Sequence, residues 1–223
     1  MALPVLVIGR SGSGKTYSLK NFKPEEVGVI SVEKGRLPFK SDIKVVRVKK
    51  FDSAEASPAQ INMARYSWIM EVIKKSKSKS IVIDDSQYLL ANELFDRANE
   101  KGYDKFTNMA ANFRDLIHFV NELEDEDKIV YFLHHSELDN DGREKVKTIG
   151  KMLDEKLCVE GCFDVVIYCQ DNKFFTQANG QSVAKTPEGM FELEIPNDLK
   201  FVDTTIRDYY GMAENNTNEE ETK

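Results

Sequence analysis

A glycine-rich segment, GRSGSGKT at residues 9–16, directly follows the apolar run LPVLVI. It matches the pattern G-x-x-x-x-G-K-[ST], with Gly9, Gly14, Lys15 and Thr16 at the fixed positions. Glycines at this spacing let successive backbone N–H groups face an anion, and a helix that starts there adds its dipole. The pattern therefore predicts a nucleoside triphosphate site, in which Lys15 reaches the β- and γ-phosphates and the Thr16 hydroxyl ligates Mg²⁺. The predicted nucleotide-binding residues are Gly9, Arg10, Ser11, Gly12, Ser13, Gly14, Lys15, Thr16 and Tyr17.

A pair of carboxylates ends a second apolar run, in the segment SIVIDDSQYLL. An apolar strand that ends in an aspartate is the Walker B pattern, and we expect Asp84 to hold Mg²⁺ directly or through water. Asp85 has two interpretations, because it could either polarise the attacking water or cap the helix that follows.

Length and composition limit the class of protein. With 223 residues, 41% of them hydrophobic, the chain is long enough to build one large α/β core. No run approaches the roughly 20 apolar residues that span a bilayer, and no basic stretch precedes the first strand as it would in a signal peptide. The three cysteines are an odd number, which argues against a disulfide framework. We therefore expect a cytoplasmic protein with no membrane segment.

Charge is distributed unevenly along the chain. The formal net charge is −7, and the final segment ENNTNEEETK carries −3 of it, which leaves −4 for residues 1–213. Because that segment lacks apolar residues, we expect it to be disordered. The sequence predicts one domain over residues 1–212 and an acidic tail over residues 213–223.

Apolar periodicity alternates between strand and helix patterns after the glycine-rich loop. Strands are expected at residues 27–33, 43–51, 80–84 and 128–137, and helices at residues 57–77 and 106–123. Strands separated by helices imply a mostly parallel central sheet flanked by helices, with ligands at the carboxyl ends of the strands. Residues 171–196 predict a C-terminal antiparallel hairpin extension with Asn179-Gly180 as its turn. The predicted fold class is α/β.

The order GRSGSGKT, ISVEKG, IVIDD, VYFLHH and then a long loop resembles the RecA-like P-loop ATPase core. More closely, the chain is similar to the small RecA-like, AAA-type ATP-binding proteins of tailed phages that are grouped with single-strand-annealing recombination functions. That likeness covers nearly all of residues 3–210 and includes GYDKFTNMAANF, KVKTIGKMLDEKL and KTPEGMFELEIPNDL. It implies an ATPase that uses Mg²⁺ and acts on single-stranded DNA in homologous recombination or single-strand annealing. The implied partners are single-stranded DNA, a single-strand-binding protein, and further copies of the chain with ATP sites at their interfaces.

The resemblance also implies catalytic roles. Glu33 matches the water-orienting glutamate of RecA-like ATPases, whereas AAA+ ring ATPases use the acid beside the Walker B aspartate, so we prefer Glu33 and place Asp85 second. His135, or its neighbour His134, falls where RecA has a polar residue that senses the γ-phosphate. Lys185 resembles the hairpin lysine that reaches the nucleotide of a neighbouring subunit.

Residues 136–150, SELDNDGREKVKTIG, correspond by the same resemblance to the mobile DNA-binding loop of RecA. The predicted DNA-binding residues are Arg143, Lys145, Lys147 and Lys151, whose charges suit backbone phosphates. Acidic residues precede them, and the loop contains no aromatic residue for base stacking. We therefore expect weak, salt-sensitive DNA binding that needs assembly or a partner.

Two other functions remain open. A nucleotide-dependent binding module with little hydrolysis, which loads or regulates another recombination or replication protein, would carry the same motifs. A P-loop kinase of nucleotides or small metabolites would need an arginine-rich lid over the transferred phosphoryl group, whereas the arginines of this chain are scattered.

Overall fold

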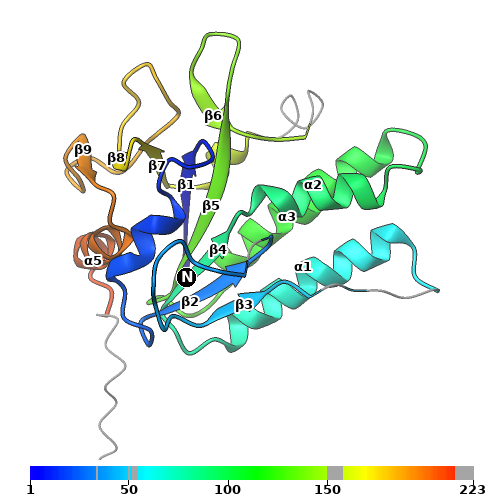
Figure 1. Cartoon of the computed structure of the whole chain (residues 1–223), viewed down its shortest axis with the longest axis horizontal. Coiled ribbons are helices and arrows are strands. Elements are labelled where there is room, and N and C mark those ends of the chain that lie inside the picture. Colours follow the sequence, from blue (N-terminus) through cyan, green and yellow to red (C-terminus); the bar gives the residue numbers. More distant parts are fainter. Residues whose placement is uncertain (34, 50, 52–54, 150–157, 214–223) are drawn as a thin grey trace, which may run out of the picture.

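The computed structural model of the chain describes residues 1–33, 35–49, 51, 55–149 and 158–213. Over these residues, helices separate most of the parallel strands, as the apolar pattern predicts, and the helices lie on both sides of one central sheet (Figure 1). Apart from residue 213, the predicted acidic tail lies outside the described residues. No helix of the described part is both long enough and apolar enough to cross a membrane.

The sheet is mostly parallel, as predicted. Its strands are β1 (Leu3–Gly9), β2 (Val27–Ser31), β3 (Val45–Arg47), β4 (Ser80–Asp84), β5 (Ile129–Leu138), β6 (Glu144–Val146), β7 (Val165–Gln170), β8 (Lys173–Phe175) and β9 (Glu194–Pro196). The spatial order is β3-β2-β4-β5-β1-β7-β8-β9, with β6 paired to β5. The strands from β3 to β7 in that order run parallel, whereas β6, β8 and β9 run antiparallel to their neighbours. The carboxyl ends of β1, β4 and β5 therefore lie at the same edge of the sheet.

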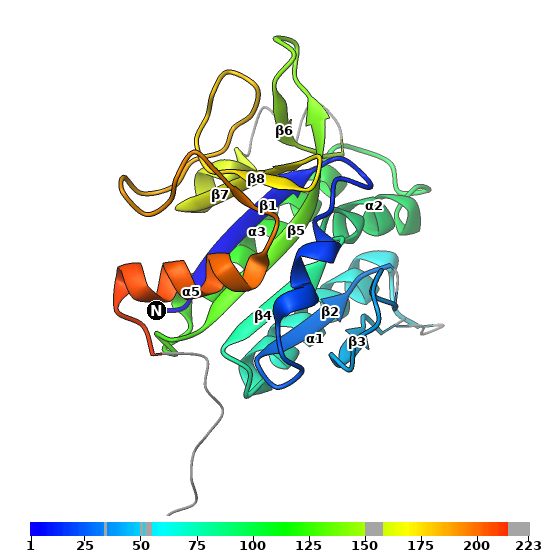
Figure 2. The same cartoon turned by 60° about the vertical axis from the view of Figure 1, so that its left-hand side comes forward.

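Helices cover both faces of the sheet. They are η1 (Thr16–Asn21), α1 (Pro58–Lys75), α2 (Gln87–Asp96), α3 (Asp104–Glu122), η2 (Val159–Cys162) and α5 (Leu199–Tyr210). Helices α1, α2 and α3 lie on one face, and α5 crosses the other (Figure 2). Side chains of β1 point alternately to the two faces of the sheet. Leu6 and Ile8 pack in the buried cluster under α1 and α3, whereas Val5 and Val7 pack in the cluster under α5. The two apolar layers hold the carboxyl edge of the sheet in place.

The start of α1 follows a local sequence signal. The Ser57 side chain accepts a hydrogen bond from the backbone N–H of Gln60, and the Gln60 side chain accepts one from the backbone N–H of Ser57. Pro58 occupies the first helical turn, where its missing N–H costs nothing. This capping box begins the helix where the sequence predicts it.

The helix predicted after the glycine-rich loop is short. It is the 3₁₀ helix η1, which ends at Asn21, and the next residue, Phe22, has an extended backbone with ψ 141°. Pro24 follows two residues later, and a proline disfavours helical backbone in the residue before it.

The predicted C-terminal antiparallel extension is present, but its hairpin turn is not at Asn179-Gly180. Strands β7 and β8 are joined at Asp171 and Asn172, which have φ angles of 50° and 58°. A two-residue turn with both residues at positive φ matches the right-handed twist of paired strands, and Asp and Asn tolerate that conformation. Asn179 and Gly180 lie in the loop between β8 and β9.

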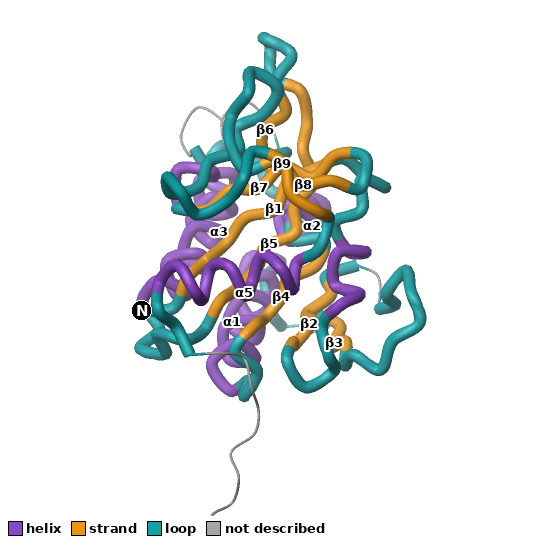
Figure 3. Tube along the Cα trace, turned by 90° about the vertical axis from the view of Figure 1, so that its left-hand side faces the viewer, coloured by secondary structure: helices purple, strands orange, loops and turns teal. Residues whose placement is uncertain are grey.

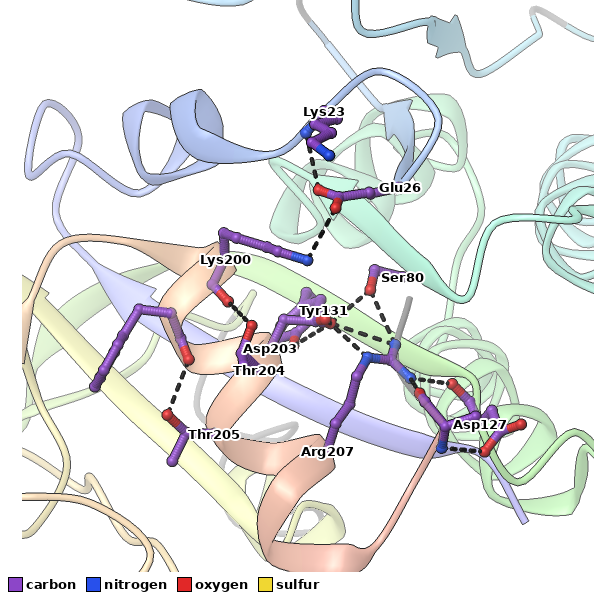
Figure 4. Close-up of polar contacts among 12 residues, drawn as sticks. Lys23, Glu26, Ser80, Asp127, Tyr131, Lys200, Asp203, Thr204, Thr205 and Arg207 are labelled. Carbon is purple, nitrogen blue, oxygen red and sulfur yellow. Dashed lines mark hydrogen bonds and ion pairs between the residues drawn. The ribbon is translucent and has the colours of Figure 1, made fainter. Parts of the chain in front are cut away.

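Helix α5 lies across the sheet (Figure 3), and a buried polar network joins the two (Figure 4). Asp203 accepts hydrogen bonds from Ser80 Oγ at 2.5 Å, Tyr131 Oη at 3.0 Å and Arg207 Nε at 2.8 Å. Arg207 Nη1 also donates to the backbone carbonyl of Asp127 at 2.7 Å. Burial, followed by the charge of Asp203, raises the pKa of Tyr131 well above its usual value. The network ties the C-terminal helix to β4 and β5 at the end of the sheet opposite the glycine-rich loop.

Candidate active site

The glycine-rich loop, hereafter the P-loop (residues 9–16), leaves the carboxyl end of β1 with two glycines in the left-handed region. Gly12 has φ 80° and Gly14 has φ 108°. A Cβ atom on Gly14 would lie 2.5 Å from Asn172 Oδ1 and 2.5 Å from Asn197 Nδ2. Asn197 Nδ2 also donates to the backbone carbonyl of Gly14 at 3.0 Å. The loop therefore requires glycine at position 14, both for its backbone conformation and for the close approach of the C-terminal extension.

Lys15 and Thr16 make different contacts: Lys15 bonds the P-loop backbone, and Thr16 bonds the end of β4. Lys15 Nζ donates to the backbone carbonyls of Gly9 at 2.7 Å and Arg10 at 3.0 Å, and its side chain is only 6% exposed. Thr16 Oγ1 donates to Asp84 Oδ1 at 2.8 Å. A hydroxyl beside a carboxylate is an oxygen donor set of the kind that Mg²⁺ accepts. The side chains predicted to hold the metal thus meet although 68 residues separate them in sequence.

A cavity of about 300 Å³ opens over these side chains, and we call it the P-loop cavity. Its described lining comes from the P-loop, the loop after β2, the carboxyl ends of β4 and β5, and the β7–β8 turn. The lining residues are Ser11, Gly12, Gly14, Lys15, Thr16, Tyr17, Arg36, Pro38, Asp84, Asp85, His135 and Asn172. Gly-rich backbone, a lysine and a hydroxyl–carboxylate pair around one hollow fit a nucleotide polyphosphate with Mg²⁺.

Asp85 and His135 form a pair inside this cavity. His135 Nε2 lies 3.4 Å from Asp85 Oδ1, and the His135 ring meets the Tyr88 ring edge-on at 5.9 Å. Asp85 has φ 62°, a conformation that is uncommon outside glycine and frequent at functional sites. The N-cap of α2 is Ser86, not Asp85. Asp85 therefore turns at the strand end and borders the P-loop cavity.

His134 is buried beneath the cavity and connects two segments. Its Nδ1 lies 2.9 Å from Ser86 Oγ, and its Nε2 lies 2.9 Å from the backbone carbonyl of Lys147. Burial lowers the pKa of His134 to about 4, so the ring is neutral near pH 7. Because a carbonyl can only accept, Nε2 carries the proton and donates to Lys147, and Nδ1 is left to accept from Ser86. His134 thus joins the residue after Asp85 to the segment that follows β6.

Glu33 is not among the residues that line the P-loop cavity. It lines a separate cavity of about 610 Å³, between the carboxyl ends of β2 and β3 and the helices α1 and α2. There Asn92 Nδ2 donates to Glu33 Oε1 at 2.7 Å. The structure thus brings Lys15, Asp85 and His135 together and holds Glu33 against α2.

Residues 136–149, which lie in the segment predicted to bind DNA, are largely a β-hairpin. Strands β5 and β6 pair from Ser136–Val146 to Leu138–Glu144, which leaves residues 139–143 as the turn. Arg143 and Lys147 are exposed, and Lys145 Nζ lies 3.7 Å from Glu137 Oε1 across the hairpin. Lys151 lies outside the described residues. Of the three described cations of the DNA-binding prediction, Arg143 and Lys145 therefore lie on one hairpin, and Lys147 directly follows it.

This hairpin contacts the P-loop directly. The buried side chain of Glu144 in β6 accepts a hydrogen bond from Arg10 Nε, so the second residue of the P-loop pairs with the hairpin. Ser13 lies nearby in sequence, and its backbone carbonyl accepts from Cys169 Sγ at 3.2 Å. Of the residues predicted to bind nucleotide, Gly9, Arg10 and Ser13 do not line the P-loop cavity, and Arg10 and Ser13 face the hairpin and β7.

Lys185 is exposed and lies away from the P-loop cavity of its own chain. Its backbone N–H donates to the carbonyl of Val166 at 2.9 Å, and the N–H of Val166 donates back at 2.8 Å. Val166 pairs with Leu6, in the middle of β1 and not at the carboxyl edge. Lys185 is therefore not brought to Lys15 within one chain.

Sequence reasoning missed Arg36, Pro38 and Asn172 as lining residues of the P-loop cavity. Arg36 and Pro38 reach it through the fold of the loop after β2, which no local motif encodes. Asn172 carried a signal, because Asp-Asn between two apolar runs is compatible with a tight turn.

Comparison with known proteins gives one family match. The family model described as "AAA domain" matches residues 1–190. A KaiC-like protein from the hyperthermophilic archaeon Pyrococcus horikoshii OT3 is 14% identical with a TM-score of 0.48, over 87% of this chain and 84% of that one. A prototypical ATPase from the type III secretion system of pathogenic bacteria is 13% identical with a TM-score of 0.44, over 86% of this chain and 55% of that one. No curated protein sequence matches the chain.

Proposed function

The chain belongs to the AAA domain family, and on that premise we propose that it is a Mg²⁺-dependent ATPase that acts on single-stranded DNA in homologous recombination or single-strand annealing. The observation that carries the ATPase assignment is the P-loop cavity, where Lys15, Thr16, Asp84, Asp85 and His135 meet around one hollow. Each type of side chain that phosphoryl transfer to water needs is present there.

The roles of the residues follow from their contacts. Lys15 exchanges its hydrogen bonds to the carbonyls of Gly9 and Arg10 for phosphate oxygens of ATP. Thr16 and Asp84 hold Mg²⁺, which supplies positive charge to the phosphate oxygens when bound. The P-loop backbone orients the phosphate chain with its N–H groups.

We propose Asp85 as the group that orients the attacking water, with His135 positioning it. A general base must first lie within reach of the reacting atoms, and Asp85 lines the cavity whereas Glu33 lines another one. The His135 side chain, 3.4 Å from Asp85 Oδ1, also borders the space where the terminal phosphate would lie. His135 is therefore the proposed γ-phosphate sensor.

Two contacts support a connection between the nucleotide and the hairpin formed by β5 and β6. His134 joins Ser86 to Lys147, and Arg10 joins the P-loop to Glu144. One partner of each contact lies close to the bound nucleotide, because Arg10 belongs to the P-loop and Ser86 directly follows Asp85, which lines the P-loop cavity. The proposal is that ATP in this way alters the position of Arg143, Lys145 and Lys147 for single-stranded DNA.

The proposed DNA contact is electrostatic and weak. Glu137, Asp139 and Asp141 lie on the same hairpin as the cations, and Lys145 is already near Glu137. Assembly of several chains, or a single-strand-binding protein, would add the missing affinity through several linked contacts. In such an assembly the exposed Lys185 of one chain is available to reach the nucleotide of the next.

The test is DNA binding measured by fluorescence anisotropy with a labelled single strand over a series of salt concentrations, in ATP and in ADP. The proposal predicts tighter binding in ATP and a linear fall of log K with log salt concentration, with a slope set by the phosphates neutralised. A double Arg143→Ala, Lys147→Ala variant should have a shallower slope, and Lys40→Ala should not. Binding that is independent of salt, or identical in ATP and ADP, would reject the DNA role and leave the ATPase role standing.

A nucleotide-dependent binding module is the second candidate, and one contact favours it. Glu33 is held by Asn92 in its own cavity, so a RecA-like base is not at the P-loop cavity in this conformation. ATP hydrolysis would be slow if Asp85 does not take over the role of Glu33 in orienting the attacking water. Single-turnover hydrolysis separates the two candidates, because a module of this kind retains bound ATP with or without single-stranded DNA.

A further inference from the structure

A second cation borders the P-loop cavity. Among the described residues that line it, Arg36 is the one arginine or lysine besides Lys15. The Arg36 side chain is exposed, and no hydrogen bond or ion pair joins it to another residue of the described chain. A guanidinium at the mouth of a phosphate-binding hollow is therefore available for a ligand.

The loop that carries Arg36 is anchored on both sides. Before it, the backbone N–H of Val32 donates to the carbonyl of Asp84 at 3.1 Å. After it, Leu37 and Phe39 pack against the apolar cluster under α5, and the Phe39 ring meets the Tyr17 ring edge-on at 6.0 Å. These contacts hold the backbone on either side of Arg36 close to the P-loop.

The strand order determines the direction from which Arg36 approaches. Strand β2 pairs with β4, and Ser31 lies directly beside Asp84 in the register. The loop after β2 therefore starts on the side of the cavity where Asp84 and Asp85 lie, across β1 from Asn172 on the β7–β8 turn. That side is where the terminal phosphate must lie if Asp84 holds its Mg²⁺.

The charges in the cavity give a reason for a cation at this place. Its described lining holds two carboxylates, Asp84 and Asp85, against the two cations Lys15 and Arg36. Without Arg36, the lining would carry a net negative charge opposite a polyanion. An arginine presents a fixed fork of donors that binds phosphate oxygens with charge-assisted hydrogen bonds.

We propose that Arg36 binds the terminal phosphate of ATP in its own chain and so distinguishes ATP from ADP. The inference deepens the proposed function and rests on it. It gives the protein a cation in cis at the γ-phosphate, in addition to any lysine that a neighbouring copy supplies. Losing one charged hydrogen-bonding group of this kind weakens binding by about 10- to 100-fold.

Isothermal titration calorimetry with the non-hydrolysable analogue AMP-PNP and with ADP, both with Mg²⁺, tests the proposal. The variants are Arg36→Ala, Arg36→Lys and the matched control Lys40→Ala, since Lys40 is an exposed cation of the same loop that does not line the cavity. Thermal melting of each variant without nucleotide shows whether it is folded.

The expected result is that Arg36→Ala weakens AMP-PNP binding by about 10- to 100-fold and leaves ADP binding unchanged, with Arg36→Lys between Arg36→Ala and the wild type. Lys40→Ala should bind both nucleotides like the wild type. Equal losses for AMP-PNP and ADP in Arg36→Ala, or no loss for either, would overturn the assignment of Arg36 to the terminal phosphate. A wild-type chain that binds neither nucleotide would instead contradict the proposed function itself, and Arg36 would lose its ligand with it.

Discussion

The Thr16 hydroxyl donates a 2.8 Å hydrogen bond to Asp84 Oδ1, and this contact joins the end of the P-loop to the end of β4. Thr16 follows β1 through the P-loop and Asp84 ends β4, and these two strands are not adjacent, because β5 lies between them in the sheet. The parallel arrangement brings the carboxyl ends of β1 and β4 to one edge, where the two side chains meet. The oxygen atoms predicted to hold Mg²⁺ are therefore in contact before any ligand binds.

Removing the Thr16 hydroxyl should impair the use of Mg²⁺. Thr16→Val keeps the shape of the side chain but loses the ligand, and we expect ATP turnover to fall by about 10- to 100-fold at a fixed Mg²⁺ concentration. Thr16→Ser, which retains the hydroxyl, is the control. A titration of turnover against Mg²⁺ should show that Thr16→Val needs more metal; an unchanged Mg²⁺ requirement would remove Thr16 from the metal site.

The choice of base can be settled by comparing two carboxylates. Because Asp85 borders the P-loop cavity and Glu33 is bonded to Asn92 in another cavity, we expect Asp85→Asn to lower kcat by about 10²- to 10⁴-fold. Glu33→Gln should retain most of the turnover, and Asn92→Ala should then change little. If Glu33→Gln abolished turnover, and Asn92→Ala increased it, Glu33 would be the base and Asn92 would hold it in an inactive position.

The buried ring of His134 should make stability depend on pH. Its folded pKa of about 4 lies below the value near 6.5 expected when the chain is unfolded, so the unfolded state binds the extra proton first as pH falls. The neutral His134 ring therefore contributes about 3 kcal/mol to the free energy of unfolding. This contribution is fully present above about pH 6.5 and is lost progressively as the pH falls to about 4.

Urea unfolding at a series of pH values from 7 to 4 measures this dependence, with His134→Gln as the comparison because it cannot titrate. The slope of unfolding free energy against pH should be smaller in the variant, whatever its stability at pH 7. Equal slopes for the two proteins would show that His134 does not titrate differently in the folded and unfolded states.

The network under α5 should dominate the stability of the C-terminal helix. Asp203→Ala removes the acceptor of Ser80, Tyr131 and Arg207 and leaves the Arg207 guanidinium buried without its carboxylate. We expect a loss of about 3–5 kcal/mol in the free energy of unfolding, measured by urea denaturation. Asp208→Ala, an exposed aspartate of the same helix, is the control and should be nearly neutral. Similar losses for both variants would contradict a special role for the Asp203 network.

Much of the candidate site could be predicted from the spacing of residues within short sequence motifs. Gly9, Gly14, Lys15 and Thr16 are fixed by one short pattern, and Asp84 by an apolar run with an acidic end. The parallel sheet followed from strands separated by helices. These features depend on neighbours within a few residues, which is the range that periodicity and motifs describe.

Features that depend on long-range packing were not predictable in the same way. The bond from Asn92 to Glu33 spans 59 residues, and no local pattern shows which cavity the Glu33 side chain enters. Arg36 reaches the P-loop cavity through the path of its loop.

Helix α5 was overlooked although its sequence carries helix signals. Asp198 caps its start, Gly211 ends it with φ 66°, and Leu199, Val202 and Ile206 form its buried stripe.

The decisive measurement is steady-state hydrolysis of ATP with Mg²⁺ by the wild type and by Lys15→Ala. We expect measurable turnover in the wild type, higher turnover when single-stranded DNA is added, and loss of both in Lys15→Ala, whose circular dichroism should show that the fold is retained. Turnover that survives in Lys15→Ala, or a wild type that binds ATP without hydrolysing it under either condition, would contradict an ATPase centred on the P-loop cavity.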